Sequence, residues 1–157
     1  MREMQPLTST LEDYLEAVFV LSSDSKGARV DDIAAHVGVH KSTVTAALHA
    51  LSGRGLVDYV PYRPVSLTSR GRRLGATIRG RHKTLRRFLT DVLGIEGALA
   101  EDTACRMEHV VPPEVVERFT SFTDFVEACP HASGRFSEGS GFSCEDGSCD
   151  GCGEGRA

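Results

Sequence analysis

Features that would place this 157-residue chain in a membrane or outside the cell are missing from its sequence. It contains no apolar run near the roughly 20 residues that a membrane-spanning helix needs, and its N-terminus lacks the pattern of a secretory signal peptide. We therefore expect a cytoplasmic protein with no membrane partner. No nucleophile–base pair of the kind an enzyme uses is recognisable, so we do not expect an enzyme.

Acidic residues are absent between Tyr59 and Thr90, although the net charge of the whole chain is −4. The same window holds a run of basic residues: Arg63, Arg70, Arg72, Arg73, Arg79, Arg81, Lys83, Arg86 and Arg87. A basic block inside an acidic protein is typical of a surface that binds nucleic acid. The alternative is the solvated face of a helix.

The pattern of apolar residues, caps and glycines predicts a mainly α fold. A Ser-x-x-Glu capping box, Ser9 to Glu12, is expected to open the first helix, which ends near Ser22. Further helices are predicted over 30–37, 41–54, 69–92, 98–109 and 113–129, and two strands over 56–68. Asp32 to Leu51 has the proportions of a helix-turn-helix, and the two strands after it predict a β-hairpin wing.

The predicted second helix of this motif begins with small and basic side chains that can approach bases and phosphates. With the wing, the expected DNA-binding residues are His40, Lys41, Ser42, Thr43, Thr45 and Arg63. The alternative is an ordinary helical hairpin that binds no DNA.

Metal-ligating residue types recur at helical spacing on both sides of this motif. Cys105, Glu108 and His109 share one face of a predicted helix, and their thiolate, carboxylate and imidazole suit a divalent transition metal. Asp13 and Glu16 form a second acidic pair at i, i+3. Each has a plainer alternative: Asp13 could complement a helix dipole, and Cys105 could be a small core residue.

Five motifs, taken in order, make the chain resemble the diphtheria-toxin-repressor family of iron- and manganese-dependent repressors. They are Ser9–Glu16, Asp32–Ala34 with Ser42–Thr45, Leu67–Gly71, Arg81–His82 and Cys105–His109. The resemblance covers roughly residues 7 to 128. It implies a winged-helix DNA-binding domain over 1–70 and an all-helical dimerisation and metal-binding domain over 71–131. The composition of the remaining segment, 132–157, predicts a flexible cysteine-containing tail. The resemblance also implies a homodimer that represses metal-homeostasis genes from a palindromic operator on double-stranded DNA.

By position, the resemblance assigns a set of six metal ligands: Asp13, Glu16, His82, Cys105, Glu108 and His109. The pattern is mixed, because the acidic pair matches the manganese regulators and Cys105 matches the iron repressors. Arg86 and Glu101 fall where the iron repressors place an ancillary site, and an arginine cannot ligate a metal. The thiolate leads us to favour Fe²⁺, with Mn²⁺ as the alternative.

The last 26 residues are rich in Gly and Ser and carry three of the five cysteines. Cys144, Cys149 and Cys152, with Cys129 upstream, have the spacing of ligands for Zn²⁺ or an iron–sulfur cluster. Without such a site, this segment has too few apolar residues to fold. Two other functions therefore stay open: a winged-helix redox sensor, and an iron–sulfur or zinc protein whose tail is the active element.

Overall fold

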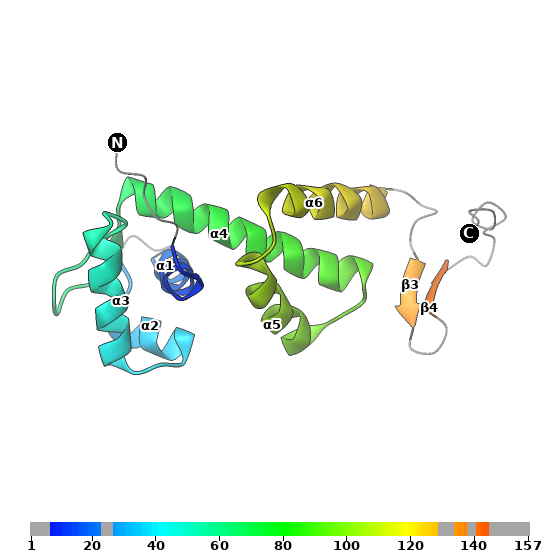
Figure 1. The fold of residues 1–157 in the computed structure, drawn as a ribbon. Coiled ribbons are helices and arrows are strands. Elements are labelled where there is room, and N and C mark those ends of the chain that lie inside the picture. Colours follow the sequence, from blue (N-terminus) through cyan, green and yellow to red (C-terminus); the bar gives the residue numbers. More distant parts are fainter. Residues whose placement is uncertain (1–6, 23–26, 129–133, 138–140, 145–157) are drawn as a thin grey trace. The chain divides into compact units, whose positions relative to one another are not determined.

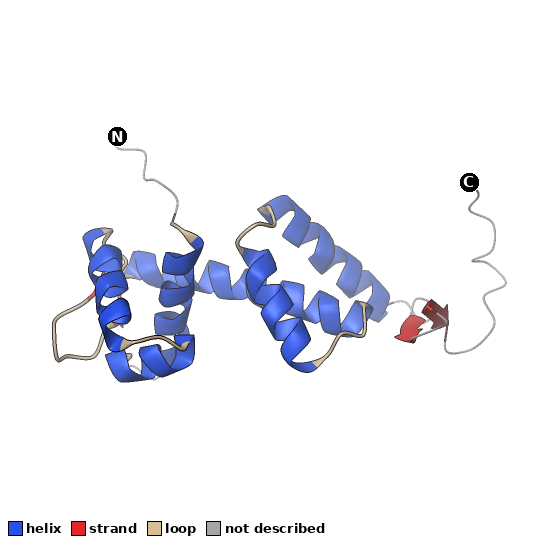
Figure 2. Ribbon diagram, turned by 60° about the horizontal axis from the view of Figure 1, so that its bottom comes forward, coloured by secondary structure: helices blue, strands red, loops and turns tan. Residues whose placement is uncertain are grey.

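The computed structural model describes residues 7–22, 27–128, 134–137 and 141–144 of the chain (Figure 1). Its helices are α1 (Ser9–Leu21), α2 (Val30–Val37), α3 (Lys41–Gly53), α4 (Ser69–Arg87), the π-helical η1 (Phe88–Val92), α5 (Gly97–Glu108) and α6 (Pro113–Ala128). The strands are β1 (Val57–Asp58), β2 (Ser66–Leu67), β3 (Gly134–Ser137) and β4 (Gly141–Cys144). Helices predominate, which confirms the predicted mainly α class (Figure 2).

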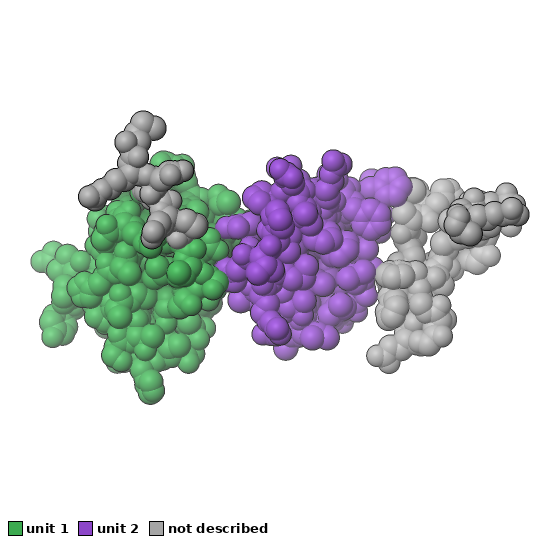
Figure 3. All heavy atoms as spheres, in the orientation of Figure 1, with its two compact units in different colours: residues 1–80 green, residues 81–157 purple. Residues whose placement is uncertain are grey.

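The chain divides into two compact units, residues 1–80 and 81–157 (Figure 3). The division falls inside α4, so this helix contributes to both units. In the described part of the chain, no helix has the length and apolar character required to span a bilayer.

Unit 1 is built around a continuous apolar core. Its fully buried side chains come from every helix of the unit and from the wing, and include Leu15, Ile33, Leu48, Leu56, Val65 and Ile78. The N-cap of the first helix lies one residue earlier than expected. Thr8, not Ser9, is the N-cap, and its Oγ1 accepts a hydrogen bond from the Leu11 amide at 3.4 Å. The predicted capping box is therefore wrong, because Thr8 already satisfies an orphan amide of the first turn.

The helix-turn-helix is formed by α2 and α3. Gly38 ends α2 in the left-handed conformation, at φ 75°, and its amide donates to Ala34 O. This is a helix end that glycine makes without steric cost. His40 is the N-cap of α3, where the next helix starts at Lys41 as predicted.

The wing is the predicted hairpin, with shorter strands than the sequence indicates. Antiparallel pairing joins Val57 to Leu67, and Ala28 forms a bridge with Val65 through hydrogen bonds of 2.8 and 2.7 Å. At the tip, the Arg63 amide donates to Val60 O, which closes a tight turn with Pro61 at its second position. Tyr62 follows with φ 66° and is fully exposed.

The start of α4 is fitted closely against the end of α3 and the wing. The Thr68 hydroxyl donates to Gly55 O at 2.8 Å and accepts from the Gly71 amide at 3.0 Å. A Cβ on Gly71 would lie 1.8 Å from Leu56 O, and one on Gly75 would lie 2.9 Å from the Phe19 side chain. These two glycines therefore allow α4 to approach its neighbours. Gly80, the third in α4, has no such neighbour within 4 Å among the described residues.

Unit 2 packs the end of α4 with η1, α5 and α6 around a small core of Leu85, Leu89, Ala100 and Ala104. Phe88 and Phe119 stack at a centroid distance of 4.4 Å. The predicted continuous helix over 69–92 is wrong at its end, since Phe88 to Val92 form a π-helix. The apolar pattern did not distinguish an α-helix from a π-helix here. Leu89 and Val92, which the pattern predicts to be buried, are buried in the π-helix as well.

A further difference concerns the tail. Without a cysteine site, no regular structure is expected after residue 132, yet β3 and β4 form an antiparallel hairpin. Its register places Phe136 opposite Phe142. The composition of the whole segment did not reveal this local pairing of the backbone.

Candidate metal centre and nucleic-acid interface

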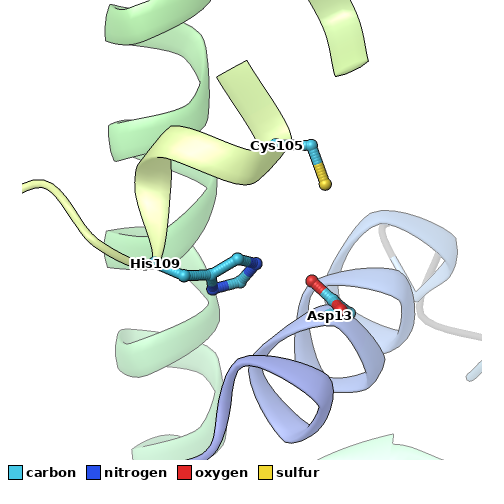
Figure 4. A group of neighbouring side chains, drawn as sticks. All are labelled: Asp13, Cys105 and His109. Atoms are coloured by element: carbon cyan, nitrogen blue, oxygen red, sulfur yellow. The ribbon is translucent and has the colours of Figure 1, made fainter. Parts of the chain in front are cut away.

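The C-terminal end of α5 gathers three of the predicted ligands. The Sγ of Cys105 and a ring nitrogen of His109 lie within 4.8 Å of each other. Figure 4 shows their side chains projecting from the same side of α5, with Asp13 drawn on its own helix, α1. Glu108 belongs to the same turn and is fully buried. Cys105 and His109 therefore share a face of α5, and Glu108 Oε1 lies 3.8 Å from His109 Nε2.

Glu108 contacts a fourth predicted ligand, His82 of α4. The His82 Nδ1 lies 2.8 Å from Glu108 Oε2, and the His82 side chain is only 5% exposed. Removing a carboxylate from water is expensive unless a partner compensates it. The imidazole of His82 is such a partner, and the pair brings a nitrogen and an oxygen donor together in the interior of unit 2.

The other ring nitrogen of His82 faces a carboxylate that sequence reasoning connected only with an ancillary site. Glu101 Oε1 lies 3.0 Å from His82 Nε2, and Glu101 Oε2 lies 2.9 Å from Arg86 Nε. Glu101 and Arg86 are each about half exposed, whereas His82 and Glu108 are buried. The incompatibility of Arg86 with metal ligation was visible in the sequence, but its ion pair with Glu101 was not.

The acidic pair of α1 lies in unit 1. Asp13 and Glu16 are both partly buried, and Glu16 Oε1 forms a 3.0 Å ion pair with Arg79 of α4. Arg79 is a contact that sequence reasoning missed, because 63 residues separate the partners. In the sequence, only the basic block that contains Arg79 offered a cation for such a contact, and that block predicts a DNA-binding surface.

The predicted DNA-reading residues surround the N-terminus of α3 and the wing. His40, Lys41, Ser42 and Thr43 are exposed, and Thr45 is partly buried with its hydroxyl donating to Lys41 O at 2.9 Å. Arg63 is exposed at the wing tip. The structure thus leaves these side chains accessible from solvent.

Lys41 is paired with Asp31 of α2. The Nζ–Oδ1 distance is 2.8 Å, and both side chains are more than half exposed. The hydrogen bond from Lys41 lowers the pKa of Asp31. A phosphate that binds Lys41 must therefore compete with a carboxylate already in place.

A hollow of about 580 Å³ lies between α3, the start of α2 and the wing. Three of its lining residues are cationic, namely Arg29, Lys41 and Arg63, and Tyr59 and Tyr62 supply aromatic surface. A concave surface lined by cations suits the phosphodiester backbone of nucleic acid. Arg29 was not among the residues predicted to bind DNA, because it lies before α2 and outside the motif.

The predicted cysteine site of the tail falls largely on residues that the structure does not describe. Cys129, Cys149 and Cys152 lie outside the described residues, and only the backbone of Cys144, at the end of β4, is described. A zinc or iron–sulfur site there stays a prediction.

Comparisons with known proteins match both parts of the chain. Residues 6–65 match the iron dependent repressor N-terminal DNA binding domain, and residues 68–137 match the iron dependent repressor metal binding and dimerisation domain. The transcriptional regulator MntR of Escherichia coli O157:H7 is 37% identical over 113 residues, which cover 72% of each protein. An uncharacterized HTH-type transcriptional regulator of Methanocaldococcus jannaschii is 29% identical over 119 residues, covering 75% of this chain and 95% of that protein.

Solved structures share the fold. The manganese regulator SloR is 26% identical with a TM-score of 0.66, and the match covers 82% of this chain and 58% of SloR. A manganese-dependent transcriptional repressor in complex with manganese is 30% identical with a TM-score of 0.66, over 77% of this chain and 56% of that one. The chain thus spans little more than half the length of these two structures.

Proposed function

This chain belongs to the iron-dependent repressor family, and we propose that it represses metal-homeostasis genes as a metal-activated homodimer. The family consists of transcriptional regulators, which confirms the prediction that the chain is not an enzyme. The observation that carries the proposal is the buried His82–Glu108 pair beside Cys105 and His109. A nitrogen, a carboxylate and a thiol gathered at one helix end fit a divalent transition metal.

We assign the regulatory metal to the six residues that the family resemblance indicates: Asp13, Glu16, His82, Cys105, Glu108 and His109. The first two belong to unit 1 and the other four to unit 2. When bound, a divalent ion supplies positive charge to a set that is rich in carboxylates. Glu16 must then exchange or share its ion pair with Arg79, so the guanidinium acts as the counter-charge of Glu16 when no metal is bound.

The proposed ligands come from both units. Binding of the metal is therefore coupled to how the DNA-binding unit is held. DNA binding must raise the affinity for metal by the same factor as metal raises the affinity for DNA. In a two-fold dimer, the two α3 helices must reach major grooves about 34 Å apart, or a multiple of that distance. A palindromic operator follows from this symmetry.

The homodimer is supported by an apolar stripe on α6. Val115, Phe122 and Phe125 are 41%, 49% and 59% exposed. Their spacing of seven and three residues places them along one side of the helix. The adjoining side of α6 packs into unit 2 through the buried Val116 and the partly buried Phe119. We propose that a second copy of this chain covers the stripe, as the matched dimerisation domain suggests.

We propose Fe²⁺ as the physiological metal, because a thiolate at Cys105 discriminates toward softer ions than Mn²⁺. Mn²⁺ is the alternative, supported by Asp13 and Glu16 and by the manganese regulators among the similar structures. Cys105→Glu should shift the response toward Mn²⁺. The assay must compare DNA binding at equal metal occupancy, since Co²⁺ and Ni²⁺ are expected to bind more tightly than either candidate.

The experiment is operator binding by fluorescence anisotropy under anaerobic, reducing conditions. We expect tight binding with Fe²⁺ and weak binding with chelator, and the difference should disappear in Glu108→Gln. The redox alternative predicts instead that oxidation, at constant metal, controls binding. Equal DNA affinity with chelator and with saturating Fe²⁺ or Mn²⁺ contradicts the proposal.

A further inference from the structure

Four side chains of unit 2 form a continuous series from the surface to the interior. Arg86 contacts Glu101 at 2.9 Å, Glu101 contacts His82 at 3.0 Å, and His82 contacts Glu108 at 2.8 Å. Burial increases along the series, from Arg86 and Glu101 at 53% exposure to His82 at 5% and Glu108 at 0%. Each residue therefore contacts the next, and the last two are proposed metal ligands.

We propose that Glu101 is a positioning residue for the metal ligand His82 and that Arg86 holds Glu101 in place. The inference rests on the proposed function, since it concerns the same metal centre. It assigns to Glu101 and Arg86 a role other than ligation, in the position where the iron repressors have an ancillary site.

The two ring nitrogens of His82 have different partners, which determine the nitrogen that can bind a metal. Nε2 faces Glu101, and Nδ1 faces Glu108. A carboxylate that accepts a hydrogen bond from one imidazole nitrogen fixes the proton there and leaves the other nitrogen as the donor to a metal. In the structure, both nitrogens contact carboxylates. When a metal binds beside Glu108 through Nδ1, Glu101 would keep the remaining proton on Nε2 and hold the ring in place.

The surroundings of Glu101 disfavour ligation by Glu101 itself. Its Oε1 contacts His82 and its Oε2 contacts Arg86, so both carboxylate oxygens are engaged. A guanidinium at 2.9 Å repels a divalent cation and remains charged at any physiological pH. The Arg86 contact also reduces the number of rotamers open to a half-exposed glutamate, which makes it a better-defined acceptor.

The test measures the affinity for Mn²⁺ by competition with a chelating dye and the number of ions per chain by native mass spectrometry. Glu101→Ala should weaken Mn²⁺ binding by about 10- to 100-fold, the usual effect of losing such a partner, with no change in ions per chain. Glu101→Gln keeps an acceptor for Nε2–H and should recover most of the affinity. Arg86→Met should fall between the wild type and Glu101→Ala.

Asp102→Ala is the matched control. Asp102 is an exposed acid on the same helix, and its contact is a 3.9 Å ion pair with Arg106. The Asp102→Ala variant removes the same charge as Glu101→Ala but keeps every contact of His82, so it should bind Mn²⁺ as the wild type does. In the Zn²⁺-loaded protein, imidazole ¹⁵N NMR should show His82 with its proton on Nε2, and this signature should be lost in Glu101→Ala but retained in Asp102→Ala.

Two results overturn the inference. If the Glu101→Ala protein binds Mn²⁺ as tightly as the Asp102→Ala protein, Glu101 does not position His82. Loss of one ion per chain in both Glu101 variants shows that Glu101 is a ligand. Failure of the proposed function has a different signature, because His82→Ala would then bind Mn²⁺ like the wild type. Thermal unfolding in chelator checks that each variant is folded.

Discussion

The two units of this chain are stabilised in different ways. Unit 1 encloses large aliphatic side chains such as Leu15, Leu48 and Ile78. The buried cluster of unit 2 is Leu85 and Leu89 with two alanines, and unit 2 also buries the polar pair His82 and Glu108. Apolar burial of about 25 cal/mol per Å² is the main source of stability in a small domain, so unit 2 has less of it.

Unit 2 also leaves apolar area on its surface, in the stripe of α6. A small core, an exposed apolar stripe and buried ligand-type side chains together indicate a unit completed by other components. If the proposed function holds, unit 1 is stable by its own packing, whereas unit 2 is completed by a second copy and by metal. Stability and regulation are thereby placed in different parts of the chain.

The largest expected effect comes from the core of unit 1. Leu48→Ala should destabilise this unit by about 3 kcal/mol, since a buried leucine loses its contacts and leaves a cavity. Leu48 is fully buried. The three tyrosines, Tyr14, Tyr59 and Tyr62, all lie in unit 1, so tyrosine fluorescence during urea unfolding follows this unit alone.

Leu99→Ala is the control, because Leu99 is 63% exposed. It should change the stability by less than about 0.5 kcal/mol. A loss in Leu48→Ala that excess metal restores would contradict the independence of unit 1.

Phe125→Glu tests the dependence of unit 2 on a second copy. A charge within the α6 stripe should weaken the dimer at least tenfold, or about 1.4 kcal/mol, because the interface would have to bury it. Sedimentation velocity over a dilution series measures the dissociation constant. Glu117→Gln changes the charge by the same amount at an exposed position on another side of α6 and should dimerise normally. Equal dimer affinity in the two variants would remove the stripe from the interface.

Tyr62→Gly separates stability from DNA binding within unit 1. A tyrosine at φ 66° is strained, and a glycine there relieves about 1 kcal/mol of strain. The variant should be more stable than the wild type by up to about that amount, yet bind operator DNA more weakly, because an exposed wing-tip side chain is lost. Urea unfolding followed by the other tyrosines and anisotropy with operator DNA provide the two measurements. Unchanged operator affinity would leave the strain without a function.

The smallest effect is expected at Asp31. Asp31→Asn should bind DNA a few-fold more tightly and with a steeper salt dependence, because Lys41 no longer has a carboxylate partner. The hydrogen bond with Lys41 lowers the pKa of Asp31 in the folded state. The ion pair therefore contributes to the stability of the folded state at pH values above the ordinary pKa of aspartate. This contribution is lost as the pH falls through the lowered pKa of Asp31. Asp58→Asn, which removes an acid of the wing, should leave the slope unchanged. Identical slopes in all three proteins would mean that Asp31 does not restrain Lys41.

Local structure was largely predictable from the sequence. The bounds of α2 and the start of α3 are as expected, because Gly38 and the apolar pattern identify them. The wing was also anticipated. These features depend on residues that are neighbours in the chain.

Contacts over long sequence separations were not predictable. Arg79 pairs with Glu16, and Arg86 with Glu101, although composition alone assigned all the arginines of this window to one basic block. A charged residue has many potential partners, and the fold selects among them. For the same reason, spacing and the family resemblance predict the ligands of the proposed metal centre, whereas the direction of each His82 nitrogen required the structure.

The glycines of α4 determine where this helix is stiff. Gly71 and Gly75 are tied to close approaches, so their backbone is held by neighbours. Gly80 has no such neighbour among the described residues, and it ends unit 1. A glycine inside a helix costs about 1 kcal/mol relative to alanine and loosens the backbone around it. The junction of the two units therefore coincides with the glycine of α4 that has room for a side chain, and Gly80→Ala would stiffen the helix there by adding one methyl group.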